Sequence, residues 1–191
     1  METGNKVIMW TAQTQIVLDT LEKDGVYYVK KQYIDEKYQE TAWSFRLAYH
    51  FLGEGMEKRV PRPAKAESPV WLYKDPKWTG AQGGAPLMKL EVPQEELLLF
   101  DMRKWNKILN MSLVGTEEER RSFDKELERQ GVTDASDVLK KPFYPALKRK
   151  IMKSWEKLFE ETDVEETYLQ GAVWRIKRKW MVRQEKFQPE Q

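Results

Sequence analysis

The chain has 191 residues and a mass of 22.8 kDa, a size that suits one compact domain. Aromatic residues make up 12% of the chain, a share typical of folded proteins and not of disordered ones, so we expect an aromatic core. The 33 basic and 31 acidic residues nearly cancel, so the overall charge does not by itself indicate a nucleic-acid partner.

The sequence has no cysteine and a single histidine, His50. These counts exclude disulfides, thiolate metal sites and a cysteine nucleophile, and any Ser-His-Asp triad would have to use His50. Its position between Tyr49 and Phe51, on an expected helix, favours a packing or capping role. A carboxylate-only magnesium site stays open, but the acidic runs at 117–119 and 160–161 are better explained as solvated helix faces, so we expect no metal.

The N-terminal segment is polar before a short apolar run, and it lacks the apolar core of a signal peptide. No stretch approaches the about 20 apolar residues that span a bilayer. We therefore expect a cytoplasmic protein with no membrane partner.

Apolar periodicity in the first half of the chain predicts alternating strands and helices. A strand over 7–11 is followed by a helix over 15–24, which Gly25 should end, and by a strand over 26–29. A helix over 41–56, which Gly53 and Gly55 should end, precedes a strand over 69–73.

The second half begins with a Gly/Pro-rich loop over 74–86 and strand candidates over 87–92 and 95–100. Asp101 is placed to cap the next helix, and Thr116 with Glu119 forms a capping box for a helix that ends near Gly131. Since that helix has only two apolar residues, the segment 116–141 is expected to be a helical surface insertion. A helix over 144–161 and one long strand or hairpin over 172–187 follow.

The order of these elements favours an α+β fold. Strands cluster early, in the middle and at the end of the chain, with helices between them, which is not regular β-α-β alternation. We expect one domain over 1–191, with mixed or antiparallel sheets and helices packed around them.

The C-terminal segment is the clearest electrostatic feature. On one expected strand, alternation places four basic residues on the same face: Arg175, Lys177, Lys179 and Arg183. The face is either a phosphate-binding strip or the solvated side of an amphipathic edge strand.

Three aromatic residues are candidates for a ligand pocket. Trp71 and Tyr73 share one face of the expected strand over 69–73, where they either line a pocket for a planar ring or belong to the core. Trp78 lies in the Gly/Pro-rich loop and is harder to bury, so it is the better pocket candidate.

Several segments, in the right order over most of the chain, resemble domain-of-unknown-function family 3841 of bacteria and their mobile elements. The family's W-T-x-Q start, P-x-W-x-W-Y, V-L-L-S-D-F-D-x-W-H and Q-A-x-x-W patterns are matched by Trp10–Gln13, Pro69–Tyr73, Leu97–Asn106 and Gln170–Trp174. Two departures stand out: Leu99–Met102 replaces S-D-F-D, and Asn106 replaces the histidine. The resemblance to this family does not point to any particular activity.

The layout is also similar to that of ADP-ribosyltransferase-like domains. There the first strand ends in a His-x-Thr or Arg motif, near Trp10 and Thr11 here, and a late strand begins with a glutamate that orients the nicotinamide ribose, near Gln170 here. The resemblance implies a nicotinamide dinucleotide as cofactor. Glutamine at the glutamate position and tryptophan at the histidine position imply a degenerate domain.

Two hypotheses follow. In the first, a nucleotide-like ligand binds in an aromatic cleft between two small sheets, with Asp101 and Glu91 as the nearest candidates for a general base. The cleft would be lined by Trp10, Thr11, Gln13, Trp71, Tyr73, Trp78, Asp101 and Gln170. In the second, the protein is not an enzyme, and the basic C-terminal strand binds RNA, DNA or an acidic protein partner.

Overall fold

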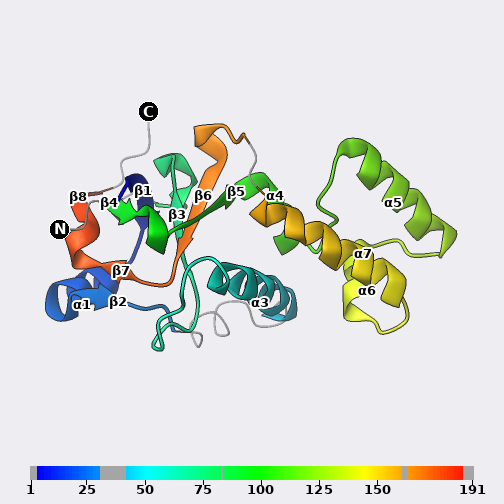
Figure 1. The fold of residues 1–191 in the computed structure, drawn as a ribbon, viewed down its shortest axis with the longest axis horizontal. Coiled ribbons are helices and arrows are strands. Elements are labelled where there is room, and N and C mark those ends of the chain that lie inside the picture. The colour runs from blue at the N-terminus through cyan, green and yellow to red at the C-terminus, as the bar shows by residue number, and fades with distance from the viewer. Residues whose placement is uncertain (1–3, 31–41, 83, 161–162, 187–191) are drawn as a thin grey trace.

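An antiparallel sheet of six strands organises the structure, a computed structural model that describes residues 4–30, 42–82, 84–160 and 163–186 (Figure 1). The strand order is β5-β6-β3-β1-β4-β8, and a separate two-stranded sheet pairs β2 with β7. The bounds are β1 (Lys6–Ala12), β2 (Val26–Tyr27), β3 (Val70–Tyr73), β4 (Pro86–Pro93), β5 (Leu98–Asp101), β6 (Leu169–Val173), β7 (Ile176–Lys177) and β8 (Met181–Lys186). The predicted α+β class is confirmed, with antiparallel pairing between the paired strands.

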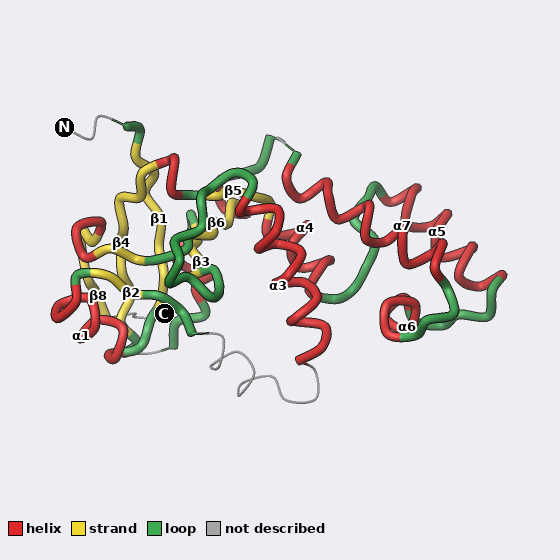
Figure 2. Tube along the Cα trace, turned by 60° about the horizontal axis from the view of Figure 1, so that its bottom comes forward, coloured by secondary structure: helices red, strands yellow, loops and turns green. Residues whose placement is uncertain are grey.

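The helices lie on either side of the sheet and extend beyond one end of it. Their bounds are α1 (Gln15–Asp24), α3 (Ala42–Glu57), α4 (Met102–Leu109), α5 (Glu117–Arg129), α6 (Ala135–Lys140) and α7 (Pro145–Trp155). Figures 1 and 2 both place α1 at the sheet end of the molecule, α3 and α4 in the middle, and α5, α6 and α7 farthest from β8. None of the helices in the described ranges combines the length and apolar character needed to cross a bilayer.

Alternation along the strands divides the apolar residues between two cores. In β3, Val70 and Leu72 are buried with Met9 of β1 and Leu21 of α1. Trp71, the residue between them, points to the opposite face and packs against the core formed with α3, α4 and α7. This period of two gives the sheet one face covered by α1 and another that carries aromatic side chains.

Local signals in the sequence place several helix ends correctly. Gly25 ends α1 with a φ of 73°, a left-handed conformation that glycine adopts without strain, and its N–H donates to the Leu21 carbonyl. The capping box of α5 is confirmed, because the Glu119 N–H donates to Thr116 Oγ1 at 3.2 Å and the Thr116 N–H donates to Glu119 Oε2 at 2.7 Å.

The helices of the segment 116–141 bury a few apolar residues against the helical end of the molecule. Phe123 and Leu127 of α5 are 2% and 6% exposed and belong to the same core as Trp155 of α7. A salt bridge joins Lys157, just after α7, to Glu119 at 2.8 Å. The two apolar residues of α5 are thus sufficient to seat it on the rest of the helical end.

The prediction of one long strand or hairpin over 172–187 is wrong. The chain instead forms β6, β7, a 3-10 turn at Arg178–Trp180, and β8. The sheet order explains the break, because β6 pairs with β3 and β5 while β8 pairs with β4, on the far side of β1. The chain must therefore cross the sheet between them, and the buried side chains of Ile176 and Trp180 hold this crossing in place.

The helix predicted to end at residue 56 ends at Glu57, so its end is confirmed to within one residue, but Gly53 and Gly55 do not end it, because the helix runs through both. Gly55 has a packing role: a Cβ there would lie 2.0 Å from Cζ of Phe159, so the ring lies directly on the helix backbone. A Cβ at Gly53 would meet its nearest neighbour, Trp174, only at 3.9 Å.

This difference predicts opposite outcomes for two alanine substitutions in one helix. Gly55→Ala should lower the free energy of unfolding by about 1–3 kcal/mol, because the methyl group displaces the Phe159 ring. Gly53→Ala should leave it unchanged or raise it by up to about 1 kcal/mol through helix propensity. Urea unfolding of both variants measures the difference, and equal effects would contradict the packing of Phe159 on α3.

Candidate functional site: an aromatic cavity over the sheet

A cavity of about 590 Å³ lies where α3 and α4 meet the ends of β1, β3 and β6. Six of the eight predicted ligand-binding residues line it: Thr11, Gln13, Trp71, Tyr73, Trp78 and Gln170. Strands β1 and β6, far apart in the sequence, thus both contribute polar residues to one hollow. The prediction that the cleft lies between two sheets is wrong. Strands β2 and β7 of the small sheet contribute none of its described lining residues.

Strand register brings the sheet residues of the cavity together. Tyr73 of β3 lies directly opposite Gln170 of β6, and Trp71 lies opposite Ala172. Directly opposed residues of antiparallel strands share one face. Trp71, Tyr73 and Gln170 therefore stand side by side on the face turned toward α3 and α4.

A cluster of three aromatic rings forms the inner wall. The ring centroid of Trp71 lies 5.2 Å from that of Tyr49 on α3 and 5.3 Å from that of Trp105 on α4. The centroids of Tyr49 and Trp105 are 6.0 Å apart. These are ordinary distances for packed aromatic pairs, so the three rings hold one another in place before any ligand binds.

Trp78 forms the rim and is 38% exposed. It lies on the 3-10 turn Pro76–Thr79, which Asp75 begins by accepting hydrogen bonds from the Lys77 N–H at 3.1 Å and from Thr167 Oγ1 at 2.8 Å. Burial raises the pKa of Asp75, but the Lys77 ammonium at 2.9 Å and these two hydrogen bonds outweigh it, and the pKa lies below its ordinary value. An ionised Asp75 thus ties the Trp78 turn to the segment before β6.

The polar groups of the cavity include some that have no protein partner. The Gln13 Nε2 donates to Thr11 Oγ1 at 2.9 Å. By contrast, Gln170 is only 3% exposed, and its side chain makes no hydrogen bond to another residue of the described ranges. The Ser68 Oγ is fully buried without a partner in that same part of the chain. Buried polar atoms without a partner are uncommon, and the two others in the described ranges, Arg120 Nε and Trp180 Nε1, lie outside this cavity.

No lining residue of the described part of the cavity carries a formal charge. The two acids considered as general bases lie elsewhere: Glu91 pairs with Lys6 at 3.6 Å, and Asp101 caps α4. His50, with an imidazole 72% exposed, lies 3.4 Å from Glu54 beside a separate hollow of about 290 Å³. Within the described residues, no three side chains of His, Asp or Glu are grouped to hold a metal ion.

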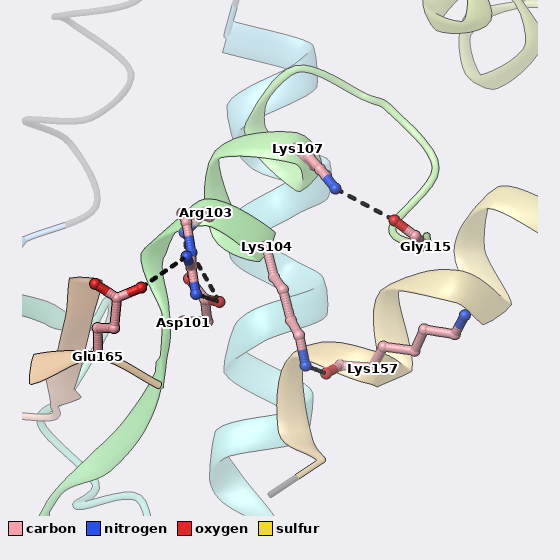
Figure 3. A network of polar contacts seen from close by, with 7 residues as sticks. All are labelled: Asp101, Arg103, Lys104, Lys107, Gly115, Lys157 and Glu165. Atoms are coloured by element: carbon pink, nitrogen blue, oxygen red, sulfur yellow. Dashed lines mark hydrogen bonds and ion pairs between the residues drawn. The ribbon is translucent and has the colours of Figure 1, made fainter. Parts of the chain in front are cut away.

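Asp101 does not line the cavity, contrary to the prediction. Its carboxylate accepts from the Arg103 N–H at 2.8 Å and from the Arg103 guanidinium at 2.9–3.1 Å, and Glu165 lies 4.0 Å from that guanidinium (Figure 3). The predicted capping role is confirmed instead.

The same network fixes α4 at several points. Lys104 Nζ donates to the Lys157 carbonyl at 2.7 Å, and Lys107 Nζ donates to the Gly115 carbonyl at 3.4 Å (Figure 3). This bracing positions the α4 residues that line the cavity: Met102, Trp105, Asn106 and Leu109.

Trp10 also lies outside the cavity lining. It stands opposite Tyr73 on one side and Lys89 of β4 on the other, and the Lys89 ammonium lies 5.6 Å from the centre of the Trp10 ring. Trp10 is therefore a neighbour of the cavity along the sheet, not part of its wall.

The lining includes residues that sequence reasoning did not select: Phe45, Tyr49, Ser68, Met102, Trp105 and Asn106. For Trp105, helical periodicity indicates only a buried face and cannot tell core from cavity wall. Sequence comparison singled out Asn106 only as the residue that replaces a family histidine. Its side chain lines the cavity.

The four basic residues at the C-terminal end do not form one strip. Arg175 and Lys177 both pair with Glu96, the former at 3.1 Å. Arg183 pairs with Glu185 at 2.8 Å on β8, and Lys179 lies on the 3-10 turn before that strand. The prediction that these four residues share one strand face is wrong, because the 3-10 turn Arg178–Trp180 interrupts the expected strand.

The buried hydroxyl of Ser68 leads to a stability prediction. Ser68→Ala should leave the free energy of unfolding unchanged or raise it by about 1–2 kcal/mol, because it removes a buried oxygen that has no hydrogen-bond partner. Thr116→Ala is a contrasting variant that should lower this free energy by about 1 kcal/mol, since its hydroxyl caps α5. Urea unfolding tests both, and a clear loss of stability in Ser68→Ala would show that the hydroxyl is paired.

Comparisons with known proteins give a family and no function. Residues 8–182 match the family described as Domain of unknown function (DUF3841), which covers most of the chain. Neither the curated proteins nor the solved structures provide a match. The protein therefore belongs to the DUF3841 family.

Proposed function

We propose that the cavity binds a planar, nucleotide-like ligand and that Gln170 recognises the polar edge of its ring. The observation that carries this proposal is the side-chain amide of Gln170, a residue 3% exposed beside Tyr73 and Trp71, which has no hydrogen-bond partner in the described ranges. The amide atoms of Gln170 are not among the fully buried unpaired atoms of the described residues, so they are accessible at the hollow, where a ligand can replace water as their hydrogen-bond partner. The cavity volume of about 590 Å³ lies in the range of small-molecule sites.

The side chains around Gln170 suit a heteroaromatic ring. Rings stack on aromatic side chains because both are flat and polarisable, and each stacked base contributes about 1–3 kcal/mol. An amide offers two donors and one acceptor oxygen, which match the edge of a nucleobase or of a nicotinamide. Thr11 and Gln13, which are hydrogen-bonded to each other at 2.9 Å, add polar side chains to the same lining.

The uncharged lining favours binding over catalysis. General acid–base catalysis needs a titratable group within hydrogen-bond reach of the substrate, and the acids of this region are engaged elsewhere. We therefore propose a degenerate ADP-ribosyltransferase-like domain that keeps a site for a nicotinamide nucleotide and carries glutamine where those enzymes use glutamate. This assignment rests on layout similarity and on Gln170.

The alternative function, nucleic-acid or acidic-protein binding through the basic C-terminal residues, has less support. Glu96 pairs with Arg175 and Lys177, and Glu185 pairs with Arg183, so three of the four basic residues already have an acidic partner. An affinity for nucleic acid that falls steeply with salt concentration would identify this function, because phosphate contacts release counterions.

Calorimetry of the full chain tests the proposal with adenosine, guanosine, cytidine, uridine and nicotinamide riboside. At least one nucleoside should bind, and Gln170→Leu should weaken its binding about tenfold or more, since the leucine fills the same space without an amide. Gln130→Leu, at an exposed position after α5, is the matched control and should bind as the wild type does.

The proposal also requires Gln170→Leu to unfold at the same urea concentration as the wild type or higher, because it removes an unpaired polar group. The absence of heat with every nucleoside, or equal affinity in Gln170→Leu, would refute the proposed function.

A further inference from the structure

A single row of opposed residues runs across all six strands of the main sheet and joins the cavity to a cationic edge. The register pairs place, in order, Phe100, Gln170, Tyr73, Trp10, Lys89 and Arg183. Directly opposed residues share one face, so the side chains of the row lie along the face that also carries the cavity. The Lys89 ammonium, 5.6 Å from the Trp10 ring centre, is consistent with this placement.

Of the two cations at the far end of the row, Lys89 is the one without an ion-pair partner among the described residues. Lys89 makes no ion pair with any residue in the described ranges, and its neighbour Arg183 is 68% exposed and pairs with the half-buried Glu185. Glu91, two residues along β4 on the same face, is already paired with Lys6. Lys89, next to the end of the row, is thus a cation that is available to an anionic group of a ligand.

The spacing of the strands sets the length of a ligand that could use both ends. Tyr73 and Lys89 are two strands apart, which corresponds to about 10 Å across the sheet. This is comparable to the reach of a nucleoside diphosphate from its base to its terminal phosphate. The half-buried ring of Trp10 lies midway, where the ribose would cross the sheet.

We propose that the ligand is a nucleoside 5′-diphosphate whose ring occupies the cavity and whose phosphates reach Lys89, with Arg183 beside it. This inference rests on the proposed function and adds the phosphate subsite to it. It also explains how a cavity with an uncharged lining can belong to a nucleotide site: the ring and the phosphates are bound on different strands.

Calorimetry at low salt tests the subsite by comparing each nucleoside with its 5′-diphosphate on the full chain. The diphosphate should bind at least about tenfold more tightly than the nucleoside, a gain typical of a charge-assisted contact. Lys89→Gln should remove this gain and leave the nucleoside affinity unchanged, while Lys89→Arg should keep most of it. Lys125→Gln, on the exposed side of α5, is the control that changes the net charge equally.

The outcomes separate the two proposals. If a nucleoside binds but its diphosphate gains nothing, or if Lys89→Gln and Lys125→Gln reduce the gain equally, the phosphate subsite is refuted and the ring site stands. If neither form binds, both proposals fail. A short single-stranded oligonucleotide that binds more tightly than the diphosphate would assign the row to nucleic acid and overturn the inference.

Discussion

The antiparallel register of β6, β3 and β1 is the constraint on which the site depends. A slip of one residue in β3 would turn Tyr73 and Trp71 toward α1 and bring Leu72 to the cavity. Gly171 helps to fix this register, because a Cβ there would lie 2.8 Å from Leu97 and 3.0 Å from Met9. The close approach on the α1 face keeps the neighbouring Gln170 turned toward the aromatic face.

The chemistry of the cavity follows from the side chains around Tyr73 and Gln170. Packed rings from β3, α3 and α4 make a stiff, largely apolar wall, and the acids near it are used to cap and brace α4. The polar side chains that remain are neutral, and Gln170 and Ser68 among them have no partner in the described ranges. Buried unpaired atoms of the described residues also occur at Arg120 and Trp180, so the proposed site rests on Gln170 and Ser68 sharing one hollow with the aromatic wall.

Sequence reasoning succeeded where the signal is local and failed where it depends on distant partners. The Gly25 cap, the capping box at Thr116 and the alternation that joins Trp71 to Tyr73 each involve residues close in the chain. The pairing of Arg175 with Glu96 and the break between β6 and β8 depend on which strands become neighbours, and one sequence does not reveal that. The convergence of Thr11 and Gln170 was expected only through the resemblance to known layouts.

The most direct test is the side-chain amide of Gln170, observed by ¹⁵N NMR and assigned from its absence in the spectrum of Gln170→Leu. On addition of a nucleoside, the two amide protons should shift as they gain an acceptor, together with the indole N–H of Trp78 at the rim. If a nucleoside binds and these resonances stay in place while others move, the ligand site lies elsewhere and the account is wrong.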